Sequence, residues 1–188
     1  EIIIEDLNIT TFDIDNDATG DTAAWQAEYD VPAGESASMS FDIVFKVSGT
    51  NVSVPLNRFG GIFYDIDGQN ANESITLAKP SFYAVDDATL LTVTKDASEN
   101  VTFQGPINTF PGVALNTDIA AFFNYYNVNT FSFSTTANNI TALPNTNLFS
   151  LVFDGCALTK FGAYDYVIDN DLALDRDKDG TPNHLDTD

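Results

Sequence analysis

The sequence predicts an all-β protein, an antiparallel β-sandwich of jelly-roll type followed by a short acidic C-terminal segment. Apolar and polar residues alternate along most of the chain, and residues 38–47, SMSFDIVFKV, show this pattern most clearly. A period of two places the apolar side chains on one face of a strand, so the pattern indicates strands with one buried face. Turn-forming clusters such as PAGES, KDASEN and ALPNTN separate the alternating stretches, as they do in sandwiches built from many short strands.

Roughly ten short strands are expected over the whole chain, because the alternating stretches recur at the spacing that is typical of a sandwich. Only residues 116–126, NTDIAAFFNYY, predict a short helix, with Asn116 or Thr117 as its N-cap. The residues predicted to face the core are Trp25, Ala27, Tyr29 and Val31; Met39, Phe41, Ile43, Phe45 and Val47; Val52, Val54 and Leu56; Leu91 and Val93; Phe131 and Phe133; and Phe149, Leu151 and Phe153.

The length and the net charge of the chain limit the number of domains and the classes of partner that can be expected. A chain of 188 residues with 44% hydrophobic content buries one substantial core, so we expect one sandwich domain, residues 1–168, and a separate segment, residues 169–188. The formal net charge of -21, with only seven Lys and Arg, argues against nucleic acids and anionic membrane surfaces as partners. No stretch has the pattern of a signal peptide or of a membrane span, so direct membrane insertion is not expected.

The C-terminal residues 175–188, DRDKDGTPNHLDTD, place oxygen donors at the first, third, fifth, ninth and twelfth positions of a loop, with Gly180 sixth. A calcium ion collects hard oxygen ligands in this order, and the glycine permits the sharp turn. The alternative, a solvated acidic tail, has no need for glycine at that position. The predicted calcium ligands are Asp175, Asp177, Asp179, the backbone carbonyl of Thr181, Asn183 directly or through water, and Asp186.

The same segment resembles a known family of calcium modules. An EF-hand needs a helix on each side of the loop and a glutamate at the twelfth position, where this loop has Asp186. The segment is more similar to a thrombospondin type 3 repeat, as found in large secreted surface adhesins of flavobacteria and their relatives. That resemblance, which covers only about residues 169–188, implies a secreted or cell-surface protein and a longer multidomain chain. Asp186 and Asp188 would then begin a following repeat.

Two more acidic clusters follow predicted strands and are further candidate calcium sites. Residues 12–21, FDIDNDATGD, form the first cluster, and residues 63–74, FYDIDGQNANES, form the second. Several carboxylates from neighbouring turns would supply oxygen ligands to one hard cation. Acidic turn residues are also common on any soluble surface, so both readings stay open. The candidate ligands are Asp13, Asp15, Asp17 and Asp21 in the first cluster, and Asp65, Asp67 and Glu73 in the second.

The residue types needed for catalysis are scarce, and no catalytic residue is predicted. The single histidine, His184, lies inside the calcium loop, which argues against zinc sites and Ser-His-Asp triads. The single cysteine, Cys156, excludes an intrachain disulfide. A glycosidase or lyase would rest on the number of acidic residues alone, so we expect a protein that is not an enzyme.

Adjacent tyrosines suggest a second function. Tyr125 and Tyr126 stand together in FFNYYNVN, and neighbours in a strand point to opposite faces, so both cannot enter the core. An exposed tyrosine beside asparagines is suited to stacking on a sugar ring; the alternative is packing within the core. We therefore predict a calcium-binding domain of a surface adhesin, in which calcium stabilises the structure and a cell-surface glycan or extracellular polysaccharide is a further candidate partner. The alternative is a calcium-dependent carbohydrate-binding module attached to a polysaccharide-active enzyme.

Overall fold

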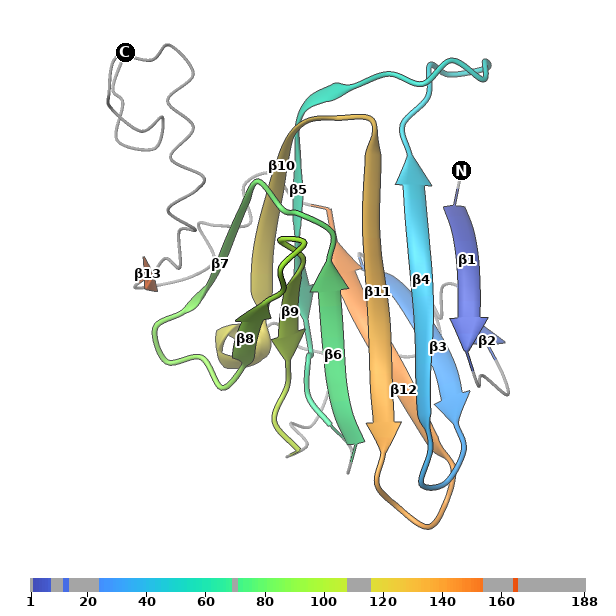
Figure 1. Ribbon diagram of the computed structural model, residues 1–188, viewed down its shortest axis with the longest axis vertical. Coiled ribbons are helices and arrows are strands. Elements are labelled where there is room, and N and C mark those ends of the chain that lie inside the picture. The colour runs from blue at the N-terminus through green and yellow to red at the C-terminus, as the bar shows by residue number, and fades with distance from the viewer. Residues whose placement is uncertain are drawn as a thin grey trace.

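The computed structural model describes residues 2–7, 12–13, 24–68, 71–107, 116–153 and 164–165, and it confirms an all-β sandwich of two antiparallel sheets (Figure 1). Sheet A has six strands in the order β1 (Ile2–Leu7), β4 (Ser36–Val44), β11 (Thr130–Asn139), β6 (Ala71–Leu77), β9 (Val101–Gln104) and β8 (Thr92–Lys95). Sheet B has seven in the order β13 (Tyr164–Asp165), β7 (Phe82–Asp86), β10 (Ala121–Val128), β5 (Leu56–Tyr64), β12 (Asn145–Val152), β3 (Trp25–Val31) and β2 (Phe12–Asp13).

The strand order is that of a jelly roll. The chain changes sheet at most of its connections, among them β3 to β4, β4 to β5, β5 to β6, β9 to β10, β10 to β11 and β11 to β12. Strands far apart in sequence therefore become neighbours, since β3 pairs with β12 and β4 pairs with β11. Figure 1 shows sheet A in front, with sheet B behind it. This arrangement of strands from both halves of the chain is the jelly-roll architecture that the sequence predicts.

Aromatic rings fill the space between the sheets. Phe41 of β4 stacks on Phe133 of β11, with ring centroids 4.8 Å apart, and Phe133 contacts Phe63 of β5 across the sandwich at 5.1 Å. Phe123 of β10 stacks on Phe131 of β11 at 4.9 Å. Ring pairs in these geometries add to the stabilisation that comes from removing apolar area from water, so the core holds the two sheets together through contacts from both.

A second, smaller apolar cluster lies on the other face of sheet B. In β10, Phe123 belongs to the main core, whereas the preceding Phe122 belongs to this second cluster and is fully buried. Successive side chains of a strand point to opposite faces, so β10 is buried on both. The outer cluster of sheet B consists of Ala24, Ile62, Tyr64, Ala84, Ala120 and Phe122, with Phe82 and Val152 packed against it.

Most of the predicted core residues are buried or half-buried, and three are exposed. Val47, Val52 and Phe153 are 46%, 62% and 49% exposed, so their prediction as core residues is wrong. β4 already ends at Val44, and residues 46–53 form a short hairpin arm closed by a single bridge between Lys46 and Ser53. An alternating sequence predicts a strand but does not reveal whether a second sheet covers its apolar side.

The predicted helix at residues 116–126 proved to be a single 3₁₀ turn, η1 (Thr117–Ile119). The Asn116 side chain accepts a hydrogen bond from the Asp118 N–H at 3.1 Å, which confirms Asn116 as the N-cap. The following AFFNYYNV forms strand β10 instead of continuing the helix. Its aromatic residues favour the strand because both faces of sheet B are buried there.

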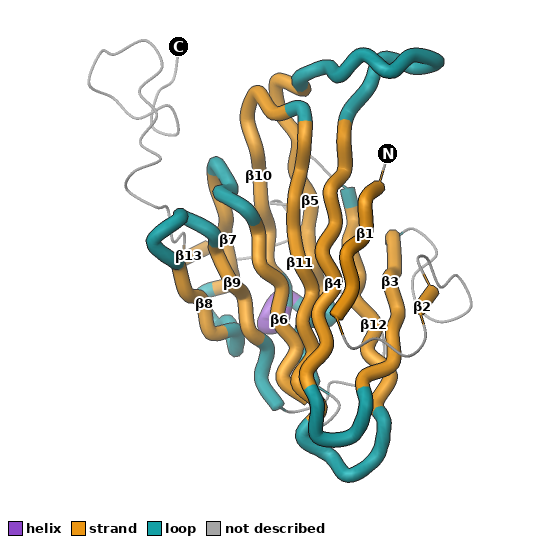
Figure 2. The backbone as a smooth tube through the Cα atoms, turned by 45° about the vertical axis from the view of Figure 1, so that its right-hand side comes forward, coloured by secondary structure: helices purple, strands orange, loops and turns teal. Residues whose placement is uncertain are grey.

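At one end of the sandwich, a buried asparagine links two loops through hydrogen bonds. Asn139 is 2% exposed, and its amide donates hydrogen bonds to the carbonyls of Val31, Pro32 and Leu143. Its carbonyl oxygen accepts from the Thr141 N–H and hydroxyl. These bonds join the β3–β4 turn to the β11–β12 loop, which lie side by side at one end of the molecule (Figure 2).

Candidate functional site

The predicted C-terminal calcium loop lies outside the described residues, and so do three residues of the first acidic cluster. The former comprises Asp175, Asp177, Asp179, Thr181, Asn183 and Asp186, and the latter Asp15, Asp17 and Asp21. Asp13 is described: it is exposed in β2, opposite Glu28 of β3. The second acidic cluster is the candidate site whose three residues are all described.

Residues 65–68, together with Glu73, form what we call the sheet-crossing corner. Here the chain leaves β5 of sheet B and enters β6 of sheet A. Asp65 adopts a left-handed backbone conformation with φ of 63°, which is uncommon for a residue other than glycine and turns the chain sharply. The Ile66 N–H then donates to the carbonyl of Ile119 at 3.0 Å, so the corner is tied to η1.

Two glycines allow the backbone to close tightly around this corner. A Cβ atom at Gly68 would lie 1.7 Å from the carbonyl oxygen of Ala71, and one at Gly105 would lie 2.2 Å from that of Ile66. Both contacts are far below any tolerable distance to backbone atoms, so each position requires glycine. The Gly105 N–H donates to the backbone carbonyl of Glu73 at 2.9 Å, which draws the segment after β9 against the start of β6.

This close packing buries acidic side chains. Asp67 is 7% exposed and Glu73 is 5% exposed. Burial raises the pKa of Glu73 well above its ordinary 4.5, and the negative charges of Asp67 and Asp65 raise it further. Burial also raises the pKa of Asp65, to about 7, with a further contribution from Asp67. The corner therefore concentrates negative charge where water shields it poorly.

The buried Tyr29 hydroxyl lies near Glu73 and beside the buried Thr135 hydroxyl. Burial is the main cause that raises the pKa of the Tyr29 hydroxyl; the nearby Thr135 hydroxyl lowers it, and the charge of Glu73 raises it. Tyr29 and Thr135 are 1% and 0% exposed, and neither hydroxyl has a hydrogen-bond partner of ordinary geometry in the described structure. Buried polar atoms normally find a partner. The two hydroxyls therefore face each other in the interior between the sheets.

The residue types at this corner suit calcium, but their side chains are not arranged as a calcium site. Carboxylate oxygens are the ligands that calcium prefers. In the part of the chain that the structure describes, however, no group of three or more His, Cys, Asp or Glu side chains is arranged to hold a metal ion. Asp65, Asp67 and Glu73 are close enough to influence one another's charge, yet they do not converge on one point.

The two tyrosines predicted as a sugar-binding pair point to opposite faces of β10, as strand geometry requires. Tyr125 is 4% exposed, and its hydroxyl donates to the Ala78 carbonyl at 2.8 Å. Tyr126 is 38% exposed, and its N–H donates to the Ser81 hydroxyl at 3.2 Å. Tyr125 is thus a core residue that cannot stack on a ligand, whereas Tyr126 stays a candidate.

The outer face of sheet A was not predicted as a functional surface. Its strands carry serine and threonine at every second position, as in SASMS and FSFSTTA. The alternation that places apolar residues on the inner face also places these polar residues on the outer face, so the sequence does indicate a distinctive outer surface. That signal is the near absence of charged residues from the polar half of the pattern in a chain that carries a net charge of -21.

Comparisons with known proteins do not assign this chain to a family. No protein-family model, no curated protein and no solved structure matches it. Among the described residues, no helix has the length and apolar character needed to cross a membrane. Function must therefore be argued from the residues and their arrangement.

Proposed function

We propose that this chain is a non-enzymatic calcium-binding domain of a large secreted or cell-surface bacterial adhesin, in which calcium stabilises the fold. Calcium would neutralise crowded carboxylates in the folded chain, and a ligand that binds only the folded state adds its binding free energy to stability. The formal net charge of -21 makes this contribution important, because self-repulsion opposes a compact state.

The observation that carries the proposal is the joint burial of Asp67 and Glu73 at the sheet-crossing corner. Two buried acids and the adjacent Asp65 are costly as anions unless a proton or a cation compensates them. Because these acids do not converge on one point, a calcium ion near the corner would take most of its six to eight oxygen ligands from backbone carbonyls and water. The chain's own contribution is to hold the acids in a tight turn.

The C-terminal segment supports the secreted and adhesive parts of the proposal. Its regular spacing of acidic residues around Gly180 resembles a thrombospondin type 3 repeat, and extracellular calcium is abundant enough to fill weak loops of this type. On this proposal, residues 169–188 connect the sandwich to further calcium-binding repeats of a longer chain.

The test is thermal unfolding of the whole chain with calcium, with magnesium and with a chelator. We expect calcium to raise the melting temperature strongly and magnesium to raise it much less, because magnesium tolerates irregular coordination poorly. Replacing Asp67 and Glu73 by their amides should remove part of the calcium effect. A D177N/D179N variant should remove the part that belongs to the C-terminal loop and make the tail sensitive to proteases.

The exposed Glu35, in the β3–β4 turn, provides the matched control, since E35Q removes one exposed negative charge that is not among the proposed ligands. Its calcium response should equal that of the unmodified chain. A melting temperature that is the same in calcium and in chelator would refute the proposed role of calcium.

A second candidate function is a calcium-dependent carbohydrate-binding module attached to a polysaccharide-active enzyme. The observation that favours it is the exposure of Tyr126, since an exposed aromatic ring stacks well on a sugar. A glycan array probed in calcium and in chelator tests this function. Binding to one glycan class that Tyr126→Ala abolishes would support it, and a blank array would count against it.

A further inference from the structure

The outer face of sheet A carries polar side chains in regular rows that cross five strands. Paired residues on neighbouring antiparallel strands point to the same face, so the register of the sheet aligns them. We call the two central rows the polar grid. They are Ser40, Ser134, Thr76, Thr102 and Thr94 in the first row, and Ser38, Thr136, Ser74, Gln104 and Thr92 in the second.

The spacing of the polar grid follows from sheet geometry. Neighbouring strands lie about 4.8 Å apart, and residues two positions apart on one strand are separated by about 6.7 Å. Nine of the ten members are hydroxyl residues and the tenth is Gln104, so the face repeats one kind of chemistry in two directions. Figure 1 shows that β4, β11, β6, β9 and β8 lie side by side on the face toward the viewer.

Hydrogen bonds between strands fix several of these side chains. Thr76 and Thr102 share a hydrogen bond of 2.8 Å, and the Thr136 hydroxyl donates to the Ser38 hydroxyl at 3.0 Å. The Ser38 hydroxyl donates in turn to the Thr135 carbonyl at 3.0 Å. A hydroxyl has one donor and two acceptor positions, so a hydroxyl that donates to its neighbour still accepts from a ligand. The rows are therefore oriented before any ligand arrives.

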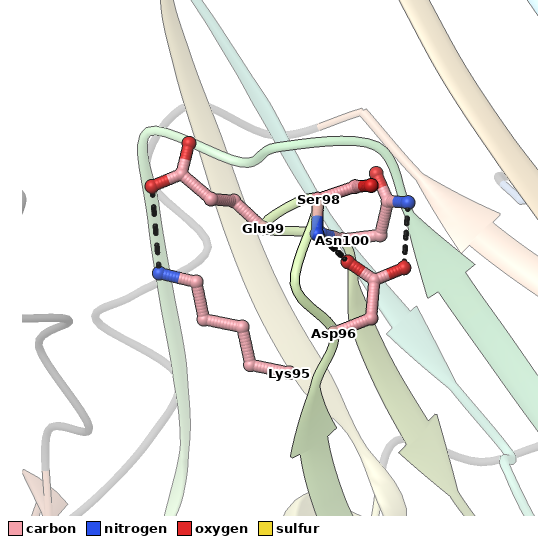
Figure 3. A network of polar contacts seen from close by, with 5 residues as sticks. All are labelled: Lys95, Asp96, Ser98, Glu99 and Asn100. Carbon is pink, nitrogen blue, oxygen red and sulfur yellow. Dashed lines mark hydrogen bonds and ion pairs between the residues drawn. The ribbon is translucent and has the colours of Figure 1, made fainter.

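The five strands of the polar grid carry little charge on this face, and the sixth strand, β1, pairs Glu5 with Ser40 at the end of the first row. Among the outward-pointing described side chains of these five strands, Asp42 is the only charged one. Lys95, the last residue of β8, follows Thr94 and so alternates away from the grid, and its Nζ pairs with Glu99 Oε1 at 3.8 Å (Figure 3). In a chain with 28 acidic residues, acids are concentrated elsewhere on the molecule.

A hollow of about 210 Å³ opens on the same face beside the first row, between β4, β11, β6 and the β8–β9 turn. The Ser132 hydroxyl donates to Asp42 Oδ1 within it. Asn100 lies at its rim, held by Asp96, which accepts hydrogen bonds from the Asn100 N–H and side-chain amide, both at 2.9 Å (Figure 3). The polar lining of the hollow consists of Ser40, Asp42, Thr76, Asn100, Ser132 and Ser134.

We propose that the polar grid and this hollow bind a neutral polysaccharide, which lies across the strands of sheet A. Sugar hydroxyls are donors and acceptors like those of the grid, and a neutral polymer meets neither charge repulsion nor the cost of dehydrating a charge. An anionic polymer would be repelled by the net charge of -21, and a cationic one would be drawn to the acidic regions instead. The surface does not depend on calcium for its contacts, and it serves an adhesin and a carbohydrate-binding module equally.

The test is co-sedimentation of the whole chain, in calcium, with insoluble cellulose, chitin and β-1,3-glucan, and with calcium alginate as the anionic polymer. We expect retention on at least one neutral polymer. S40K/T76K, which places two charged side chains in the first row, should reduce the apparent affinity at least tenfold. The exposed Asn57 of β5 lies in sheet B, so N57K should leave retention unchanged.

A second variant, T76V/T102V, keeps the size of both side chains and removes their hydroxyls. We expect it to weaken binding several-fold without lowering the melting temperature. This variant therefore still tests the role of the hydroxyls in binding if the two lysines of S40K/T76K disturb the sheet. Retention on alginate alone, no retention on any neutral polymer, or equal retention of all variants would overturn the proposal. Inhibition of ice-crystal growth without polysaccharide binding would overturn it as well, because ordered water would then be the ligand of the grid. Failure of this test would leave the calcium-dependent change in melting temperature untouched.

Discussion

The two outer faces of the sandwich differ in chemistry although the sheets are built from the same alternating pattern. The outer face of sheet B carries an apolar cluster that includes Phe122, which is fully buried, and Ile62, which is 2% exposed. The outer face of sheet A carries half-buried or exposed serines and threonines. Asp42 is the only charged outward-pointing described residue on the five strands of the polar grid, whereas the outer face of sheet B includes Glu28 and Arg58.

This difference indicates what each face contributes. The apolar cluster of sheet B removes area from water and so stabilises the fold. The polar grid of sheet A makes hydrogen bonds that are partly exposed, and such bonds add little net stability. On the proposal made above, the regular composition of sheet A serves recognition, whereas the apolar cluster of sheet B serves folding.

The largest effect is expected from Phe122→Ala on the outer face of sheet B. Phe122 is fully buried and meets the Phe82 ring edge to face at 5.8 Å. Truncating a buried phenylalanine removes its transfer free energy and leaves a cavity, so the free energy of unfolding should fall by about 3–5 kcal/mol. Urea denaturation followed by fluorescence measures this loss.

Phe153 provides the control of the same residue type, since it is 49% exposed while still touching Phe59 at 5.5 Å. Phe153→Ala should cost about 1 kcal/mol or less, because little area changes its environment. Equal costs for the two variants would show that the outer cluster of sheet B contributes nothing beyond ordinary surface packing.

An intermediate effect is expected from Glu73, which lies on the inner face of the same strand that carries Ser74 and Thr76 outward. The pKa values of Glu73 and Asp65 are raised in the folded chain, so the folded state binds more protons than the unfolded state. Stability must then fall as the pH rises from about 4, where unfolded carboxyls titrate, through about 7, the folded pKa of Asp65. In chelator, the chain should melt at a higher temperature at pH 5 than at pH 7.5.

The Glu73→Gln variant removes the more deeply buried of these two carboxyl groups. Its melting temperature should therefore depend less on pH and should exceed that of the unmodified chain at pH 7.5 in chelator. The E35Q variant should follow the unmodified chain. A melting temperature that rises between pH 5 and pH 7.5 would mean that Glu73 is compensated within the chain itself.

The sequence predicted the fold class because the alternation is strong and local. Trp25 to Val31, Met39 to Phe41 and Phe131 to Phe133 all lie where the period of two places them. The exposed arm at Val52 was mispredicted, since whether an apolar side chain is covered depends on the other sheet. The pairing of β3 with β12 joins residues more than 100 positions apart, and no local pattern encodes such a contact.

The sequence grouped Asp65, Asp67 and Glu73 as one acidic cluster, and metal binding by that cluster stays a prediction. The spacing of Asp65, Asp67 and Glu73 around a turn predicted that they would act together, and the structure places them within electrostatic reach. Sequence could not reveal that Tyr29 approaches Glu73, because Tyr29 belongs to β3 and Glu73 to β6, which lie in different sheets. It also could not separate the buried Tyr125 from the exposed Tyr126 until the register of β10 was known.

The smallest effect is expected on the outer face of sheet A, from Ser132→Ala. The Ser132 hydroxyl donates to Asp42 Oδ1, and both residues are half-buried. Water replaces a lost hydrogen bond at such a position, so the free energy of unfolding should change by about 1 kcal/mol or less in urea denaturation. Polysaccharide retention should fall more than this small change in stability would suggest, because Ser132 and Asp42 line the hollow. A variant that loses several kcal/mol of stability would show that sheet A also depends on its outer face for folding, and the contrast between the two faces would then disappear.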